Sequence, residues 1–160
     1  ETFVQAEPNT LENTEIWTPD IELYNSEESI HSTLDPQQAS LTSDGALWWS
    51  RSGHVNVLCK FKGLRNYPLD VLTCTMELGA WSRSKGSQDL IFRLVDGGYN
   101  FPTKESDSGG TSSTSGSTFQ DYKIQDVTVY RTEFLFDCCP HAFPQLYYKI
   151  KIQRVNNFYV

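Results

Sequence analysis

The sequence predicts an all-β fold, an antiparallel β-sandwich, from three observations. Residues 146–153 alternate strictly, with leucine, tyrosine and isoleucine on one side and tyrosine, lysine and glutamine on the other, which is typical of a half-buried antiparallel strand. Further strand-like runs, rich in Ile, Val, Phe and Tyr or alternating in the same way, cover residues 54–61, 89–95 and 122–136. No stretch shows a helical apolar stripe with caps at both ends. Many short strands of this kind favour a sandwich.

The length and charge of the chain narrow its class. Its 160 residues suit one domain with a real core. Thirteen Lys and Arg face twenty Asp and Glu, and the net charge of −7 disfavours nucleic acid as a partner. No apolar run is long enough to span a bilayer and no signal segment opens the chain, so we expect a mature chain or a fragment. Residues 106–118 read SDSGGTSSTSGST and predict a mobile loop within the single domain.

The cysteines leave several possibilities open. They are Cys59, Cys74, Cys138 and Cys139, and an even count suits two disulfides with three possible connectivities. Buried free thiols are one alternative. A zinc site made by the last two cysteines with His54 or His141 is another, although adjacent cysteines rarely both ligate one zinc. His31, His54 and His141 show neither triad nor metal spacing, and no G-x-S-x-G elbow is present. We therefore expect no enzyme, no metal and no cofactor.

Three segments carry a family resemblance. Residues 17–25 read WTPDIELYN. The interval from Cys59 to Cys74 contains YPLD and is followed by GAW at 79–81, and residues 136–143 read FDCCPHAF. In this order they resemble the first binding loop, the signature loop with the second binding loop, and the vicinal-cysteine loop of Cys-loop (pentameric ligand-gated) receptors of the nicotinic acetylcholine receptor and acetylcholine-binding-protein type. Residues 154–159 resemble the stretch before the first membrane helix.

The resemblance implies a fold, a location and an assembly. Residues 1–160 are identified as a curled, immunoglobulin-like antiparallel β-sandwich, the extracellular ligand-binding domain, without the family's N-terminal helix and first strands. The implied disulfides are Cys59–Cys74 and Cys138–Cys139. The implied partners are identical subunits of a homopentamer, a small cationic or amphiphilic ligand at the subunit interface, and the membrane, through a C-terminal pore domain not in this chain. The domain would lie on the extracellular face of the cell membrane, and ligand-driven loop closure would be coupled to gating.

The same resemblance implies the site residues. The principal face would consist of Tyr24, Trp81, Phe136, Cys138, Cys139 and Phe143, and the complementary face of Trp48 and Ser50. Open aromatic faces attract organic cations, with tryptophan the strongest. Trp48 and Trp49 are neighbours on a strand and point to opposite faces, so one should pack inside and one should reach a subunit interface. Trp17 is expected in the core, because tryptophans are usually largely buried.

The chain departs from the family pattern at several positions. The signature loop is one residue longer and carries Leu69 after its proline. Phe136 and Phe143 replace two tyrosines, and Glu77 and Gln145 stand at the places of a lysine and an acid. Acetylcholine should therefore bind more weakly than in nicotinic receptors.

The sequence leaves two alternatives open. A secreted acetylcholine-binding-protein relative would be the same module without a pore. An immunoglobulin-like adhesion or carbohydrate-binding sandwich would instead be a monomer, with Cys59 and Cys74 in separate sheets and no cation pocket.

Overall fold

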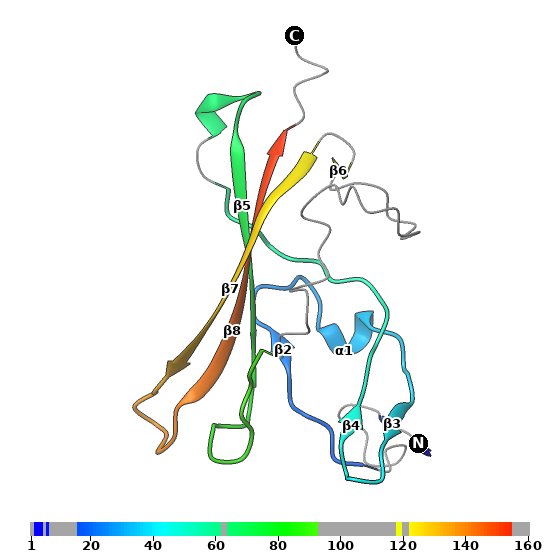
Figure 1. The fold of residues 1–160 in the computed structure, drawn as a ribbon. Coiled ribbons are helices and arrows are strands. Elements are labelled where there is room, and N and C mark those ends of the chain that lie inside the picture. Colours follow the sequence, from blue (N-terminus) through cyan, green and yellow to red (C-terminus); the bar gives the residue numbers. More distant parts are fainter. Residues whose placement is uncertain are drawn as a thin grey trace. The chain divides into compact units, whose positions relative to one another are not determined.

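The computed structural model describes residues 2–4, 6, 16–61, 64–92, 118–119 and 122–154. Their secondary structure is almost entirely β (Figure 1). A single-turn helix, α1 (Ile30–Thr33), and a 3₁₀ turn, η1 (Leu64–Asn66), interrupt the strands. No helix among these residues is both long and apolar enough to cross a membrane.

The chain divides into two compact units, each assembled from segments far apart in sequence. The first unit consists of Glu1–Leu58, Leu78–Leu90 and Glu133–Gln145. The second consists of Cys59–Glu77, Ile91–Thr132 and Leu146–Val160. All the residues predicted to bind ligand fall in the first unit.

The first unit contains a three-stranded antiparallel sheet in the order β1-β3-β4. These strands are β1 (Thr2–Val4), β3 (Ala39–Leu41) and β4 (Leu47–Trp48). Gly45 lies in the β3–β4 turn with a φ of 85°, a conformation that glycine adopts without steric penalty. The register places Phe3 opposite Ser40 and Ser40 opposite Trp48, so these three side chains share one face of the sheet.

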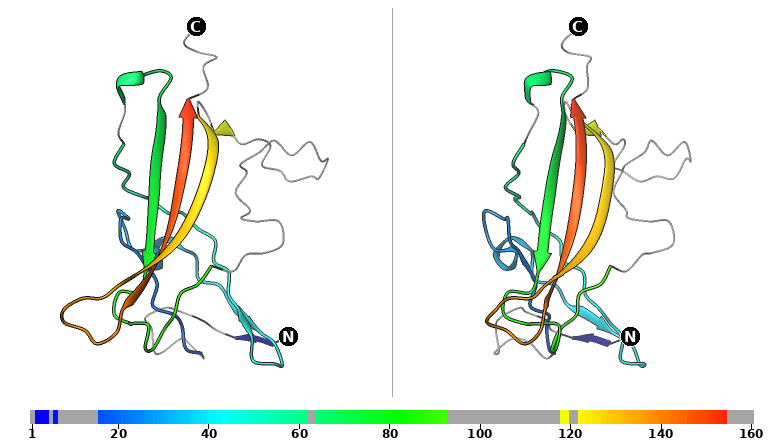
Figure 2. Two further views of the ribbon diagram at one scale, coloured as in Figure 1. Left: turned by 60° about the vertical axis from the view of Figure 1, so that its left-hand side comes forward. Right: turned by 90° about the vertical axis from the view of Figure 1, so that its left-hand side faces the viewer.

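A five-stranded sheet has the order β2-β5-β8-β7-β6. Its strands are β2 (Glu22–Leu23), β5 (Val71–Gly79), β6 (Thr118–Phe119), β7 (Tyr122–Phe134) and β8 (Phe143–Arg154). The long strands β5, β8 and β7 run side by side, mostly within the second unit (Figure 2). Their β-branched and aromatic residues suit a pleated surface. Tyr130 and Tyr147 stack at 4.7 Å between ring centroids with an interplanar angle of 2°.

The predicted fold class, an all-β antiparallel sandwich, is confirmed, and so are two of its predicted strands. Residues 122–136 contain β7, and residues 146–153 lie inside β8. The alternation in 146–153 does not separate a buried face from an exposed face, because every residue from 146 to 153 is half-buried.

The other predicted strands are wrong or lie partly outside the described residues. Residues 54–61 form no strand; they exchange isolated backbone bonds with residues 25–27, such as Leu58 N to Asn25 O at 2.8 Å. These isolated backbone bonds do not continue into a ladder, so the alternating side chains of this segment do not belong to a strand. Residues 89–92 are also not a strand, and 93–95 lie outside the described part. The predicted mobile loop 106–118 also lies outside it, except for Thr118, where β6 begins.

Small and aliphatic side chains form the core. The buried apolar residues in the described part are Ala6, Leu23, Ala39, Leu72, Ala80, Leu90 and Ile124. The prediction that Trp17 lies in the core is wrong, because its side chain is 57% exposed. The guanidinium of Arg83 lies 5.0 Å from the Trp17 ring centroid, so a cation covers this indole instead of core side chains.

Candidate functional site

Tyr24 and Trp81 are placed beside each other by the pairing of β2 with the end of β5. This antiparallel register sets Glu22 opposite Gly79, and the Tyr24 side chain reaches back from the end of β2 across Gly79. The Tyr24 hydroxyl donates a hydrogen bond to the Ala80 carbonyl at 2.7 Å. The Tyr24 and Trp81 ring centroids are 6.3 Å apart at an angle of 59°. Trp81 itself is 74% exposed, so much of its ring is available to a ligand.

Gly79 is required for this arrangement. A Cβ atom at position 79 would lie 2.7 Å from Cζ and 2.8 Å from Cε2 of Tyr24, closer than side chains tolerate. The phenol ring therefore rests directly on the glycine backbone. The glycine of the GAW motif thus positions Tyr24 next to Trp81.

Asp20 organises the segment that carries Trp81. Its Oδ2 atom accepts hydrogen bonds from the Ser82 backbone N–H at 2.6 Å and the Ser82 hydroxyl at 2.7 Å. Burial alone would raise the pKa of Asp20, but hydrogen bonds from Ser82 and from the backbone of Trp81 and Arg83 outweigh it and lower the pKa. Buried Gln88 adds two bonds to the Asp20 main chain, from Asp20 N to its Oε1 at 2.9 Å and from its Nε2 to Asp20 O at 2.6 Å.

The vicinal cysteines lie at the tip of the hairpin between β7 and β8. Cys138 and Cys139 are joined as a disulfide, with their Cα atoms 3.7 Å apart. The backbone N–H of Cys139 donates to Phe136 O at 3.0 Å and tightens the turn. The rings of Phe136 and Phe143 meet edge to face, with centroids 5.5 Å apart. The described site therefore holds two aromatic pairs, Tyr24 with Trp81 and Phe136 with Phe143.

The predicted complementary-face residues lie in the three-stranded sheet. Trp48 is 60% exposed and shares its face with Phe3, which is 65% exposed. Ser50, just beyond β4, is also exposed. Trp49 points to the other side and is half-buried, with its indole N–H donating to Gln37 O at 2.9 Å. The outward aromatic of the tryptophan pair is therefore Trp48.

Arg51 fixes the connection between α1 and this sheet. Its guanidinium donates to the carbonyls of Asp35 at 3.1 Å, His31 at 3.4 Å and Leu34. The same guanidinium lies 5.4 Å from the Trp49 ring centroid. Burial lowers the pKa of Arg51, and the charge of Asp35 opposes that effect. Arginine at this position thus satisfies the orphan carbonyls at the end of α1 and holds Trp49.

The resemblance implies a Lys–Tyr–Asp linkage in other family members, and the matching positions of this chain hold Glu77, Phe136 and Gln145 instead. Gln145 is buried in the first unit, and Phe136 has no hydroxyl. Glu77 belongs to the second unit, where its charge acts on Tyr147. Burial is the main reason that the Tyr147 pKa is raised; a hydrogen bond from Thr132 opposes this and the Glu77 charge adds to it.

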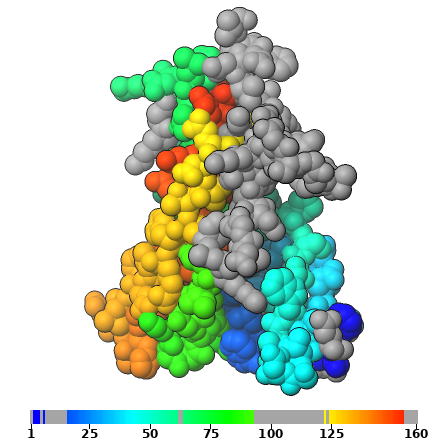
Figure 3. All heavy atoms as spheres, in the orientation of Figure 1, coloured from blue at the N-terminus to red at the C-terminus, as the bar shows by residue number. Residues whose placement is uncertain are grey.

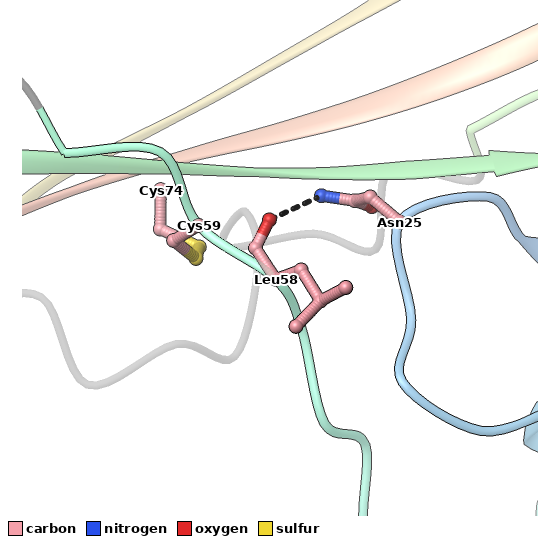
Figure 4. Close-up of a disulfide and its surroundings, with 4 residues drawn as sticks. All are labelled: Asn25, Leu58, Cys59 and Cys74. Atoms are coloured by element: carbon pink, nitrogen blue, oxygen red, sulfur yellow. Dashed lines mark hydrogen bonds between the residues drawn. A yellow bond between two sulfur atoms is a disulfide. The ribbon is translucent and has the colours of Figure 1, made fainter.

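The second unit contains the disulfide-closed loop. Cys59 and Cys74 form the predicted bond, closing a loop that in the chain-entropy model is stabilised by about 3 kcal/mol (Figure 4). Leu58, immediately before Cys59, accepts a hydrogen bond from the Asn25 side chain at 3.4 Å.

The same loop contains a buried carboxylate. Asp70 is 1% exposed and pairs with Arg154 at 2.9 Å. The Arg154 guanidinium also lies 5.0 Å from the Tyr67 ring centroid and 4.9 Å from that of Tyr122. The end of β8 is thereby fixed to the disulfide-closed loop. Among the described residues, no group of three or more His, Cys, Asp or Glu could hold a metal ion.

Comparison with known proteins gives the family. A sequence model of the neurotransmitter-gated ion-channel ligand binding domain matches residues 1–156. The chain belongs to this family. Neuronal acetylcholine receptor subunit alpha-3 of Homo sapiens is 28% identical over 144 residues, covering 90% of this chain and 26% of the relative. The Carassius auratus alpha-3 subunit is 27% identical, covering 90% of this chain and 25% of the relative.

A more distant organism supplies a similar match. The acetylcholine receptor subunit alpha-type acr-16 of Caenorhabditis elegans is 26% identical, again over 90% of this chain and 26% of the relative. The chain spans about a quarter of the length of these relatives. Family membership confirms the resemblance drawn from the three motifs.

Several residues that shape the site were not singled out from the sequence. Asp20 is the last residue of the WTPD motif, and its place directly after the proline could have marked it as a residue that shapes the site. Gln88, Arg51, Lys85 and Glu133 form hydrogen bonds with partners 16 to 68 residues away, and no local pattern marks them.

Proposed function

We propose that this chain is the ligand-binding part of a pentameric ligand-gated channel and binds a small organic cation or amphiphile. The observation that carries the proposal is the exposed Trp81 ring. It lies beside the ring of Tyr24, whose hydroxyl donates a hydrogen bond to the carbonyl of Ala80, the residue before Trp81. An indole face attracts a cation by about 0.5–2 kcal/mol. The net charge of −7 adds a general attraction for cations.

The principal face in this proposal comprises Tyr24, Trp81, Phe136, Phe143 and the Cys138–Cys139 bond. The complementary face, with Trp48 and Ser50, would come from the next copy in a homopentamer. Support comes from Trp48 and Phe3, which are both exposed on one sheet face, because adjoining exposed apolar side chains are typical of an interaction surface. Closure of the vicinal hairpin over the ligand would bias an attached pore toward opening, provided the ligand binds the closed state more tightly.

The apolar surface of the disulfide-closed loop favours a channel over a secreted binder. Leu64, Tyr67 and Leu69 are 55%, 55% and 60% exposed, and Val71 is 44% exposed. Such a group of exposed apolar residues is typical of a docking surface. A pore domain would cover it, whereas a secreted relative would leave it in water.

The ligand should not be acetylcholine at nicotinic affinity. Phe136 and Phe143 retain aromatic faces but lack the hydroxyls of the family's tyrosines, and each lost neutral hydrogen bond costs about 0.5–1.5 kcal/mol. Together these losses correspond to about tenfold in affinity. A more apolar cation suits the Phe136–Phe143 pair better.

Titration calorimetry with acetylcholine tests the proposal on the full chain, in the oligomeric state that light scattering shows. We expect weak binding that Trp81→Ala abolishes and that Phe136→Tyr strengthens by about two- to tenfold. Trp17→Ala is the matched control, because Trp17 is an exposed tryptophan stacked by Arg83 and is not part of the proposed site. Nicotinic-like affinity in the wild-type chain would refute the argument from the phenylalanines. Unchanged cation binding after Trp81→Ala would refute the site.

A further inference from the structure

Lys85 contacts both ends of the vicinal hairpin. It lies four residues after Trp81, in a turn closed by Ser87 N and Gln88 N donating to Ser84 O at 2.9 and 3.0 Å. Its ammonium group lies 2.6 Å from the carboxylate of Glu133, near the end of β7. Its backbone N–H donates to the carbonyl of Ala142, just before β8, at 2.8 Å.

A close approach of the backbone adds a third contact. A side chain at Gly86 would lie 2.8 Å from Cδ2 of His141, so the imidazole rests directly on the turn. Figure 3 shows the hairpin, in orange, lying against the green segment that carries this turn. The turn is itself fixed, because Gln88 bonds to the main chain of Asp20. The hairpin is therefore tethered to an anchored segment.

We propose that Lys85 is a positioning residue, whose ion pair with Glu133 holds the Cys138–Cys139 hairpin against the Trp81 segment. The inference rests on the ligand-binding role proposed above. The hairpin needs such a tether because the residues at the positions of the family's Lys–Tyr–Asp linkage, Glu77, Phe136 and Gln145, cannot form one. Since both charged side chains are partly exposed, at 44% and 31%, the pair adjusts the hairpin's opening equilibrium modestly and leaves the fold intact.

Reduction of the vicinal disulfide in the ligand-free full chain measures this opening. Dithiothreitol reaches Cys138–Cys139 more readily when the hairpin swings away, and alkylation followed by mass spectrometry reports the rate. Lys85→Met and Glu133→Gln should each accelerate the reduction by about two- to fivefold, whereas Lys85→Arg should retain the wild-type rate. The difference between wild type and Lys85→Met should disappear in about 1 M salt, where the charges are screened. Cys59–Cys74 is the internal control, and its rate should not change.

Two results would overturn the inference. One is an unchanged rate at Cys138–Cys139 in both charge-removing variants. The other is equal acceleration at both disulfides, which would mean general destabilisation. Because this assay needs no ligand, its outcome is independent of whether the proposed cation site exists.

Choline titration then tests the positioning role. Lys85→Met should raise the Kd for choline by about two- to fivefold, with recovery in Lys85→Arg. A Kd equal to that of the wild type in Lys85→Met would overturn the role of Lys85 at the site. Failure of the wild-type chain to bind any cation would instead contradict the proposed function.

Discussion

Alanine at position 79 should force Tyr24 out of its place, and the structure sets the size of the effect. The new Cβ would lie 2.7 Å from Cζ of Tyr24, while the hydroxyl of that ring is held by Ala80 O at 2.7 Å. Overpacking of this kind costs about 1–3 kcal/mol, and losing the hydrogen bond costs about 0.5–1.5 kcal/mol. Alanine also restricts the unfolded chain, which returns about 0.4–1 kcal/mol. The net loss in the free energy of unfolding should be about 2 kcal/mol.

Urea denaturation of a double-mutant cycle checks the cause. In a Tyr24→Ala background the obstructing ring is gone, so Gly79→Ala should have nearly no effect or a slight stabilising one. The coupling free energy between the two positions should then be about 2 kcal/mol. The reasoning is refuted if Gly79→Ala destabilises the Tyr24→Ala protein as much as the wild type, or leaves the wild-type stability unchanged.

Three further substitutions test other contacts. Asp20→Asn should lower the free energy of unfolding by about 1 kcal/mol at neutral pH. Because folding lowers the Asp20 pKa, the stabilisation by Asp20 is fully present above the ordinary pKa of 3.8 and is lost as the pH falls through the lowered value. The urea midpoints of the two proteins should therefore converge in acid. Arg51→Met should lower the free energy of unfolding by about 1–2 kcal/mol, because it removes the hydrogen bonds to the carbonyls at the end of α1. It should also shift the Trp49 fluorescence, because the guanidinium no longer lies over that ring. An unchanged urea midpoint would contradict this. Arg154→Gln should cost about 2–4 kcal/mol by leaving buried Asp70 without its cation, and adding Asp70→Asn should recover part of that loss in thermal melts.

The sequence predicted the fold class and the family because both depend on short local patterns. Alternation in 146–153 and the β-rich run after residue 122 gave β8 and β7 with bounds close to those observed. The WTPD, YPLD, GAW and FDCCPHAF segments carry the family because their residue types are tied to turns and disulfides at fixed places.

The sequence did not predict interactions that the fold creates between distant segments. Trp17 was expected inside because tryptophan is apolar, but Arg83, which covers it, is 66 residues away in sequence. The contacts of Lys85 with Glu133 and Ala142 depend in the same way on the hairpin meeting the Trp81 segment. Residues 54–61 alternate like a strand, yet Val57 forms only an isolated bridge, with Ser26.

We propose that Trp81 binds a cation through its ring face. Titration calorimetry with choline and with its neutral isostere, in which a tert-butyl group replaces the trimethylammonium group, tests this most directly, because the two molecules share one shape and differ in charge. Choline should bind the wild-type chain about two- to thirtyfold more tightly than the isostere, and Trp81→Ala should remove that preference. Equal affinities in the wild-type chain, or a preference for choline that survives Trp81→Ala, would contradict the claim.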